Sequence, residues 1–194
     1  MTRREPQGAD LPLLRWGEEL RRTRIARHRL QRRMAACAGL IALLSLTIVT
    51  PPSPRLVWNA SASAPLGLYA VDPHAVLTTG DMVIARVPQP MRRMSAARGY
   101  IPAKVPLVKR IAAVPGDMIC ATGDAIFVRG RWVARRLARD GTGRMLPWWN
   151  GCILLHDRQY FLLMEEAPAS FDGRYFGVTK SADIVGKARL LWRS

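Results

Sequence analysis

The sequence predicts a mostly-β domain that follows one N-terminal membrane-spanning helix. The helix is indicated by an uncharged run of 17 residues, MAACAGLIALLSLTIVT at 34–50, directly after a basic leader. The β domain is indicated by short apolar or alternating runs from residue 68 onward. Gly, Pro and Asp separate these runs, as they do at turns between strands. Together these patterns predict one exported β domain on a single anchor.

The first 33 residues form a basic leader, which we expect in the cytoplasm. The leader carries ten arginines and four acidic residues, whereas no arginine lies between residues 50 and 54. The positive-inside rule therefore places the N-terminus in the cytoplasm and everything after Arg55 outside. The predicted organisation is a leader at 1–33, an anchor and linker at 34–54, and an extracytoplasmic domain at 55–194.

The uncharged run is slightly short for a membrane span. At about 1.5 Å per residue it covers roughly 25 Å, whereas the hydrocarbon core of a bilayer is about 30 Å thick. Val57 and Trp58, or local thinning of the bilayer, would complete the span. A cleaved secretory signal is the alternative, because ASA at 62–64 imitates a cleavage site. We favour a retained anchor, because a secretory signal has a short leader and ASA lies about a dozen residues beyond the apolar run.

The exported part contains six segments that we predict as strands or strand pairs. In chain order they are GLYAVDP (67–73), GDMVIARVP (80–88), PLVKRIAAVPGDMICA (106–121), DAIFVRGRWVA (124–134), RQYFLLM (158–164) and DIVGKARLLW (183–192). Two segments lack this pattern. We expect QPMRRMSAARGY at 89–100 to be a polar connection and RRLARDGTGRMLPWWNGC at 135–152 to be a long loop.

The charge and the metal-binding residue types argue against several classes of function, although DNA binding by the basic leader stays an alternative. A net charge of +16 would suit nucleic acid, because neutralised phosphates release counterions. No zinc-finger spacing, RNP motif or recognition-helix pattern accompanies the charge, so we predict membrane lipid rather than nucleic acid as a partner. CxxC and HExxH spacings are also missing from the sequence, and we predict neither a metal nor a cofactor.

Three cysteines are present, and their positions differ in chemical setting. Cys37 falls in the uncharged run, whereas Cys120 and Cys152 fall in the exported part. An oxidising compartment allows those two to form a disulfide, which we take as the leading interpretation. Two unpaired core cysteines are the alternative.

Lysine is rare in this chain, and one lysine has an unusual setting. Only four of the 30 basic residues are lysines, and Lys109 lies among apolar neighbours in PLVKRIAAV. Burial lowers the pKa of a lysine toward neutrality, and a neutral lysine can activate a serine as a nucleophile. Ser63, in the loop NASASAPLGLY at 59–69, is the candidate partner. The alternatives are a snorkelling lysine at a strand edge and a Ser-His-Asp triad, for which GxSxG is missing.

Four blocks of sequence resemble a known enzyme superfamily. They are SAPLGLY at 63–69, matching SxPxGLY, then RGYI at 98–101, KRIAAVPGD at 109–117 and SFDGRYFG at 170–177. In this order, after a single anchor, they resemble the type I signal peptidase superfamily, and most closely its conjugative-transfer branch of TraF-type peptidases. The resemblance covers residues 34–194. Gly173 departs from it, because the motif usually has serine there.

The resemblance implies a role for each matching residue. It implies Ser63 as the nucleophile, Lys109 as the general base, and Ser61 together with the Ser63 N–H as the oxyanion hole. The remaining implied roles are for Ser170, which orients the lysine, for Asp172 and Arg174, which form a supporting ion pair, and for Pro65, Gly67 and Tyr69, which shape the substrate loop. The implied fold is an antiparallel β-sheet domain, and no cofactor is implied.

The implied function is a membrane-anchored serine endopeptidase of the inner membrane, with its catalytic domain in the periplasm. The implied substrate is a conjugative pilin precursor, trimmed and in some systems closed into a ring by acyl transfer, and conjugation or type IV secretion components are the implied partners. General removal of signal peptides is the first alternative. A non-catalytic anchored component of a secretion or conjugation apparatus is the second.

Overall fold

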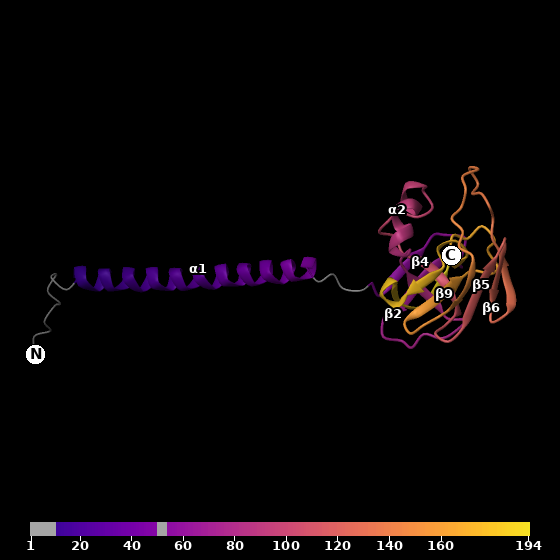
Figure 1. Ribbon diagram of the computed structural model, residues 1–194. Helices are drawn as coiled ribbons and strands as arrows, with labels where there is room; N and C mark the ends of the chain where they lie inside the picture. Colours follow the sequence, from indigo (N-terminus) through magenta and orange to yellow (C-terminus); the bar gives the residue numbers. More distant parts are fainter. Residues whose placement is uncertain (1–10, 50–53) are drawn as a thin grey trace, which may run out of the picture. The chain divides into compact units, whose positions relative to one another are not determined.

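The computed structural model describes residues 11–49 and 54–194, and the chain divides into two compact units, residues 1–52 and residues 53–194. The described part of the first unit is one helix, α1 (Leu11–Val49), shown in Figure 1. The predicted span falls on the second half of α1, except for Thr50, which lies outside the described residues. Within the described ranges, no helix reaches the combination of length and apolarity that a bilayer crossing requires.

The second unit contains two antiparallel sheets. The larger sheet has seven strands in the order β1-β2-β11-β3-β4-β9-β10. These strands are β1 (Leu56–Asn59), β2 (Gly67–Asp72), β3 (Met82–Ala85), β4 (Leu107–Ala113), β9 (Gln159–Leu163), β10 (Val178–Lys180) and β11 (Ile184–Arg193). Every pairing between neighbouring strands is antiparallel. This confirms the prediction of a mostly antiparallel β domain.

The smaller sheet has four strands in the order β7-β6-β5-β8. They are β5 (Met118–Thr122), β6 (Ala125–Val128), β7 (Arg131–Arg135) and β8 (Gly151–Leu154). In Figure 1 the labelled strands β5 and β6 lie on one side of the domain, beyond β9 of the larger sheet. Ile119, Ile126 and Phe161 belong to one buried cluster, so apolar side chains from both sheets form a common core.

Three short helical segments complete the domain: α2 (Gln89–Ala97), α3 (Gly173–Phe176) and η1 (Ser181–Asp183). The polar connection predicted at 89–100 contains a helix that was not predicted, because α2 occupies most of that segment. Pro90 stands in the first turn of α2, where its missing N–H leaves no bond unmade. Met91 packs with Val87 and Leu107, so burial against the sheet stabilises a helix that polar composition alone did not predict.

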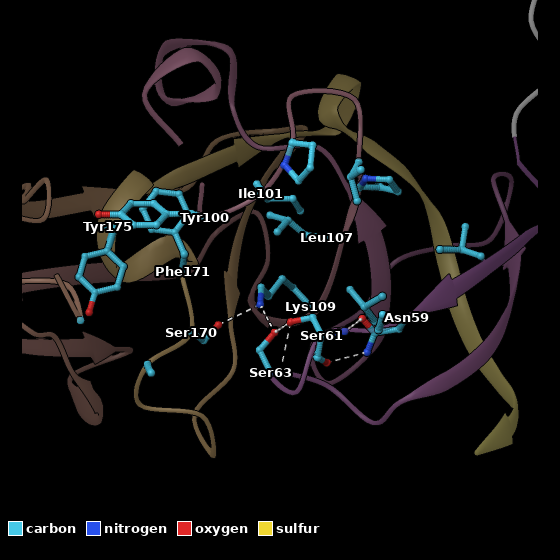
Figure 2. Close-up of a pocket in the computed structure, with 18 of the residues that line it drawn as sticks. Asn59, Ser61, Ser63, Tyr100, Ile101, Leu107, Lys109, Ser170, Phe171 and Tyr175 are labelled. Atoms are coloured by element: carbon cyan, nitrogen blue, oxygen red, sulfur yellow. Dashed lines mark hydrogen bonds between the residues drawn. The ribbon is translucent and has the colours of Figure 1, made fainter. Parts of the chain in front are cut away.

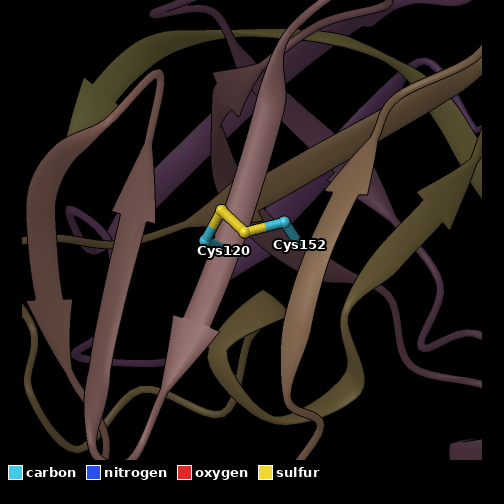
Figure 3. Close-up of a disulfide and its surroundings, with 2 residues drawn as sticks. All are labelled: Cys120 and Cys152. Atoms are coloured by element: carbon cyan, nitrogen blue, oxygen red, sulfur yellow. A yellow bond between two sulfur atoms is a disulfide. The ribbon is translucent and has the colours of Figure 1, made fainter.

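Three strands, β1, β8 and β10, lie outside the predicted segments, and one disulfide joins two strands of the smaller sheet. β1 precedes the first predicted strand and pairs with β2 along its whole length. Cys120 and Cys152 form the disulfide shown in Figure 3. They lie directly opposite each other in the register of β5 and β8. The disulfide therefore fixes the strand that leads out of the long loop before residue 151.

Candidate active site

The loop between β1 and β2 carries the small polar residues that the sequence singled out, and Asn59 holds it in shape. Asn59 is buried, and its side-chain amide donates hydrogen bonds to the carbonyl oxygens of Ser61 at 3.0 Å, Ala64 at 3.1 Å and Pro65 at 3.0 Å. Its Oδ1 accepts a hydrogen bond from the N–H of Ser61 at 3.1 Å. One side chain therefore satisfies four backbone groups of the loop, which fixes its path without regular structure.

The three residues predicted to shape the substrate loop, Pro65, Gly67 and Tyr69, stabilise the loop between β1 and β2 without lining the nearby cavity. Tyr69 is buried, and its hydroxyl donates to the Pro65 carbonyl at 2.9 Å. Gly67 has a φ of 144°, and a Cβ there would overlap the carbonyl oxygen of Trp192. Gly67 therefore permits the close approach of β11, rather than leaving room for a substrate.

Lys109 lies on β4, in the interior of the larger sheet, and its side chain is buried at 2 % exposure. Its Nζ donates to Ser63 Oγ at 2.7 Å and to Ser170 Oγ at 2.9 Å (Figure 2). Burial lowers the pKa of Lys109 to about 8; the Asp172 carboxylate opposes this shift and the Arg174 guanidinium adds to it. A lysine with this pKa exists partly as the neutral amine near neutral pH.

The hydroxyl of Ser61 lies beside Ser63. The two Oγ atoms are 3.1 Å apart, and the N–H of Ser63 donates to Ser61 Oγ at 3.4 Å. Three hydroxyl groups, those of Ser61, Ser63 and Ser170, thus gather around the amine of Lys109, as Figure 2 shows. A hydroxyl and a backbone N–H next to a nucleophile are the donor types that stabilise a developing oxyanion.

Ser170 lies at the start of a buried segment that an ion pair stabilises. Asp172 caps helix α3 and binds Arg174 through both carboxylate oxygens, at 2.8 and 3.1 Å. Both side chains are fully buried. Asp172 also accepts the N–H of Met164 at 3.1 Å, and Arg174 donates to the Met164 carbonyl at 2.7 Å. The pair therefore ties the segment that carries Ser170 to the end of β9, because Met164 directly follows that strand.

Gly173 has a local explanation in this chain. A Cβ at this position would lie 2.7 Å from the carbonyl oxygen of Leu162 and 2.7 Å from a ring carbon of Phe161. A real Cβ does not approach other atoms this closely, so a serine would require β9 to move. The Leu162 carbonyl and the Phe161 ring thus leave no room for a side chain at this position, and Asp172 and Arg174 keep their contacts around the glycine.

A cavity of about 480 Å³ opens beside the Lys109 amine. Of the predicted site residues, Ser61, Ser63, Lys109 and Ser170 line it, whereas Asp172 and Arg174 act from outside it. Sequence reasoning did not include the aromatic residues Tyr100, Phe171 and Tyr175, which line the cavity too. The sequence could have indicated these residues, because all three fall inside the motif blocks RGYI and SFDGRYFG. In the part of the chain that the structure describes, no group of three His, Cys, Asp or Glu could hold a metal ion.

Comparison with known proteins gives consistent matches. The family model for signal peptidase, peptidase S26, matches residues 29–193. A probable conjugal transfer protein TraF of Sinorhizobium fredii is 32 % identical, over 77 % of this chain and 87 % of its own length. A conjugal transfer protein TraF of Agrobacterium tumefaciens is 30 % identical, over 68 % of this chain and 78 % of its own. A signal peptidase I structure from Enterococcus faecalis matches 58 % of this chain and 97 % of its own, with 17 % identity and a TM-score of 0.36, too low to support a conclusion.

Proposed function

The chain belongs to the signal peptidase family, peptidase S26, in its TraF-type branch, and on this premise we propose a serine endopeptidase with Ser63 as nucleophile and Lys109 as general base. One observation carries the proposal: the buried Nζ of Lys109 lies 2.7 Å from Ser63 Oγ. A desolvated lysine at this distance is able to take the serine proton. In the neutral amine the lone pair would accept that proton over the same hydrogen bond.

The proposed reaction proceeds in two steps. Neutral Lys109 takes the hydroxyl proton while Ser63 Oγ attacks the scissile carbonyl, and the resulting oxyanion accepts hydrogen bonds from the Ser63 N–H and the Ser61 hydroxyl. The protonated lysine then gives its proton to the leaving amine as the C–N bond breaks. Water attacks the acyl-enzyme with Lys109 again acting as base, and Ser63 is regenerated. If the amine of the same product chain attacks instead, a cyclic peptide forms.

Ser170 is the proposed orienting residue for the base. Its Oγ lies 2.9 Å from the lysine amine and is itself buried. Two fixed oxygen atoms, one on Ser63 and one on Ser170, restrict the direction of the amine. We propose that Asp172 and Arg174 act one step further away, by fixing the backbone that carries Ser170.

The proposed substrate is an exported precursor polypeptide, most specifically a conjugative pilin. The proposal of a conjugative substrate is supported by the two relatives reported above, because both are named as conjugal transfer proteins. General removal of signal peptides is the second candidate within the same chemistry. A non-catalytic component of a secretion apparatus is the third, and it would leave the depressed pKa of Lys109 without a purpose.

We also propose that residues 34–50 anchor the chain in the inner membrane, with the leader in the cytoplasm and residues 55–194 in the periplasm. Within α1 the side chains of Leu40, Ile41 and Leu43 are more than 60 % exposed, and no charged residue follows residue 33. Local thinning of the bilayer would accommodate so short an apolar stretch. Carbonate extraction and protease accessibility of a C-terminal tag test this topology; a tag protected in spheroplasts would contradict it.

The test of the catalytic proposal is co-expression of the chain with a candidate pilin precursor, followed by mass spectrometry of the product. We expect Ser63→Ala and Lys109→Met to reduce processing to the level without enzyme. Ser181→Ala and Lys180→Met change the same residue types at positions that do not line the cavity, and both should process normally. A product one water lighter than the trimmed peptide would identify cyclisation. Processing by Ser63→Ala would refute the proposed nucleophile, and cleavage of signal-peptide substrates alone would favour general secretion.

A further inference from the structure

The catalytic cavity has two chemically different ends. Polar atoms of Ser61, Ser63, Lys109 and Ser170 meet at one end. The remaining lining is mainly apolar or aromatic and includes Ile101, Leu107 and the rings of Tyr100, Phe171 and Tyr175. Among the described residues that line the cavity, Lys109 is the one cation and none is acidic. In Figure 2 the three aromatic rings stand together on the side of Lys109 away from Asn59.

The aromatic side chains form a continuous row that leads to the dyad. The ring of Tyr100 lies 5.0 Å from that of Phe171, which stacks on Tyr175 at 5.7 Å with an interplanar angle of 6°. Phe171 follows Ser170 directly in the chain, and Ser170 contacts the Lys109 amine. We call Tyr100, Phe171 and Tyr175 the aromatic wall. Its position is thus coupled through the backbone to the residue that orients the base.

A polar network fixes the outer member of the aromatic wall. The hydroxyl of Tyr100 donates to Asp140 Oδ2 at 2.6 Å, and the Arg144 guanidinium donates to the same oxygen at 2.7 Å. The Tyr100 hydroxyl, with Thr142 and Arg144, holds the pKa of Asp140 well below its usual range. A carboxylate with a pKa this low stays charged at physiological pH, so this contact persists.

The loop that carries Asp140 is bound to the RGYI segment at a second point as well. Arg98 donates to the Met145 carbonyl at 2.6 Å, while Arg144 donates to the Arg98 carbonyl at 2.9 Å. Three hydrogen bonds, one between two side chains and two from a side chain to a backbone carbonyl, therefore join residues 98–100 to residues 140–145. The RGYI motif, to which the catalytic chemistry assigns no role, is thereby placed over the cavity.

We propose that Tyr100, held in place by Asp140, is a specificity-determining residue that closes a pocket for a bulky apolar side chain of the substrate. This inference rests on the proposed function, because it describes the same cavity. An extended peptide whose scissile carbonyl meets Ser63 would extend past the aromatic wall. Most side chains that line the cavity are uncharged, so a carboxylate or ammonium placed against the aromatic wall would lose hydration at a cost. A leucine side chain or a phenylalanine ring would instead replace water against the aromatic faces.

The test is a set of peptides derived from one cleaved precursor, in which each position from four before to three after the scissile bond is varied among Ala, Leu, Phe and Glu. The enzyme is the full chain in detergent. At one position we expect kcat/KM for Leu or Phe to exceed that for Ala by about 10-fold to 200-fold. This is the discrimination that an apolar pocket achieves for a methylene group of the substrate. Glu at that position should block cleavage. If no position prefers a bulky apolar residue, the proposal is wrong.

Three variants assign the preference to Tyr100. Tyr100→Ala should reduce the Phe-over-Ala ratio toward one. Tyr100→Phe keeps the ring and loses the hydrogen bond to Asp140, so it should lower the ratio by a smaller factor, and Asp140→Asn should behave in the same way. The matched control is Thr78→Ala, which removes a hydroxyl hydrogen bond to a different aspartate, Asp81, at 3.0 Å and should retain the wild-type ratio. An unchanged ratio in folded Tyr100→Ala, or in Tyr100→Phe if the alanine variant does not fold, would assign the pocket to other residues.

The outcome also separates this inference from the proposed function. If the wild-type chain cleaves the peptides and Ser63→Ala does not, the peptidase proposal holds whatever the side-chain preference. A flat preference would then contradict the role of Tyr100 alone. If Ser63→Ala cleaves as well as the wild type, the nucleophile is wrong and the cavity is not the site of cleavage.

Discussion

The two residues that flank the Lys109 amine are supported in different ways. Ser63 lies on a partly exposed loop, whose shape depends mainly on hydrogen bonds from the single side chain of Asn59. Ser170 is buried, next to the fully buried ion pair of Asp172 and Arg174 and to the end of β9. The side that carries Ser170, the proposed orienting residue, is therefore part of the core, whereas the side that carries Ser63, the proposed nucleophile, is a surface loop.

This difference suits the proposed chemistry. A base with a depressed pKa must remain dry, so its surroundings must be rigid and sealed. A nucleophile must meet a polypeptide arriving from solvent, so its loop must be open on one face. The comparison predicts that changes on the Ser170 side reduce stability, whereas changes on the Ser63 side reduce turnover.

The largest effect is expected on the buried side. Asp172→Asn keeps the size of the side chain but leaves the Arg174 guanidinium buried without its counter-charge. Breaking a buried pair in this way lowers the free energy of unfolding by about 3–5 kcal/mol. Chemical denaturation of the variant measures it.

The matched control is Asp183→Asn, which removes a partly exposed pair with Arg92. We expect it to change the free energy of unfolding by less than about 1 kcal/mol, because solvent screens exposed pairs. If both variants lose the same stability, the Asp172–Arg174 pair is not the special support that the comparison assumes.

Some residues of the candidate site could be predicted from the sequence, whereas others could not. Ser63 and Lys109 could be proposed as a pair because their blocks are local patterns, each readable without knowing the fold. The strand character of residues 106–121 also followed from local hydrophobicity, although it divides into β4 and β5, which belong to different sheets. Features that depend on a partner distant in the chain were not predictable in this way.

Asn59 and Gly67 illustrate the second kind of feature. Nothing in NASASAPLGLY reveals that the asparagine amide bonds three carbonyl groups, because those groups converge only after the loop closes. Gly67 looks like a turn residue, yet its requirement comes from β11, more than a hundred residues later. Helix α2 was missed for the same reason, since its stability comes from packing against Val87 and Leu107.

A smaller effect, on turnover, is expected on the loop side. Asn59→Ala removes the hydrogen bonds that hold the Ser61 and Ser63 segment, and small displacements of reacting groups cost about 10²-fold in rate. We expect kcat to fall by about that factor while KM for the precursor changes little. Asn59→Asp keeps the acceptor for the Ser61 N–H but turns an oxygen toward three carbonyl oxygens, so it should be no better than alanine.

A double-mutant cycle with Ser61→Ala identifies the route of this effect. Ser61→Ala alone should reduce kcat by about 10²–10³-fold if its hydroxyl stabilises the oxyanion. If Asn59 acts by positioning Ser61, the second substitution should add much less than its separate effect. Fully additive losses would mean that Asn59 supports the loop by another route.

The smallest expected effect on the rate is its dependence on pH, which is set by the pKa of Lys109 and by the nearby Asp172. Because the active form of Lys109 is the neutral amine, kcat/KM should rise about tenfold per pH unit below a pKa of about 8 and level off above it. Asp172 raises the pKa of Lys109, so Asp172→Asn, at temperatures where it is folded, should shift this midpoint to lower pH. A profile that is flat from pH 6 to 9 would contradict Lys109 as the base.

The same depressed pKa makes a prediction about stability that does not need a substrate. Between about pH 8 and 10.5 the unfolded chain binds more protons at this lysine than the folded chain, so the free energy of unfolding rises with pH through that window. Below about pH 8 the lysine is protonated in both states, and the destabilisation caused by burying its charge is constant. Lys109→Met removes the penalty, and its Tm should exceed that of the wild type at pH 7 by a margin that shrinks toward pH 10.5. Lys180→Met, at an exposed position, should show no such dependence. A lysine retained only to stabilise the sheet would give the opposite sign, with Lys109→Met melting below the wild type at pH 7, and that result would remove the reason for treating its burial as functional.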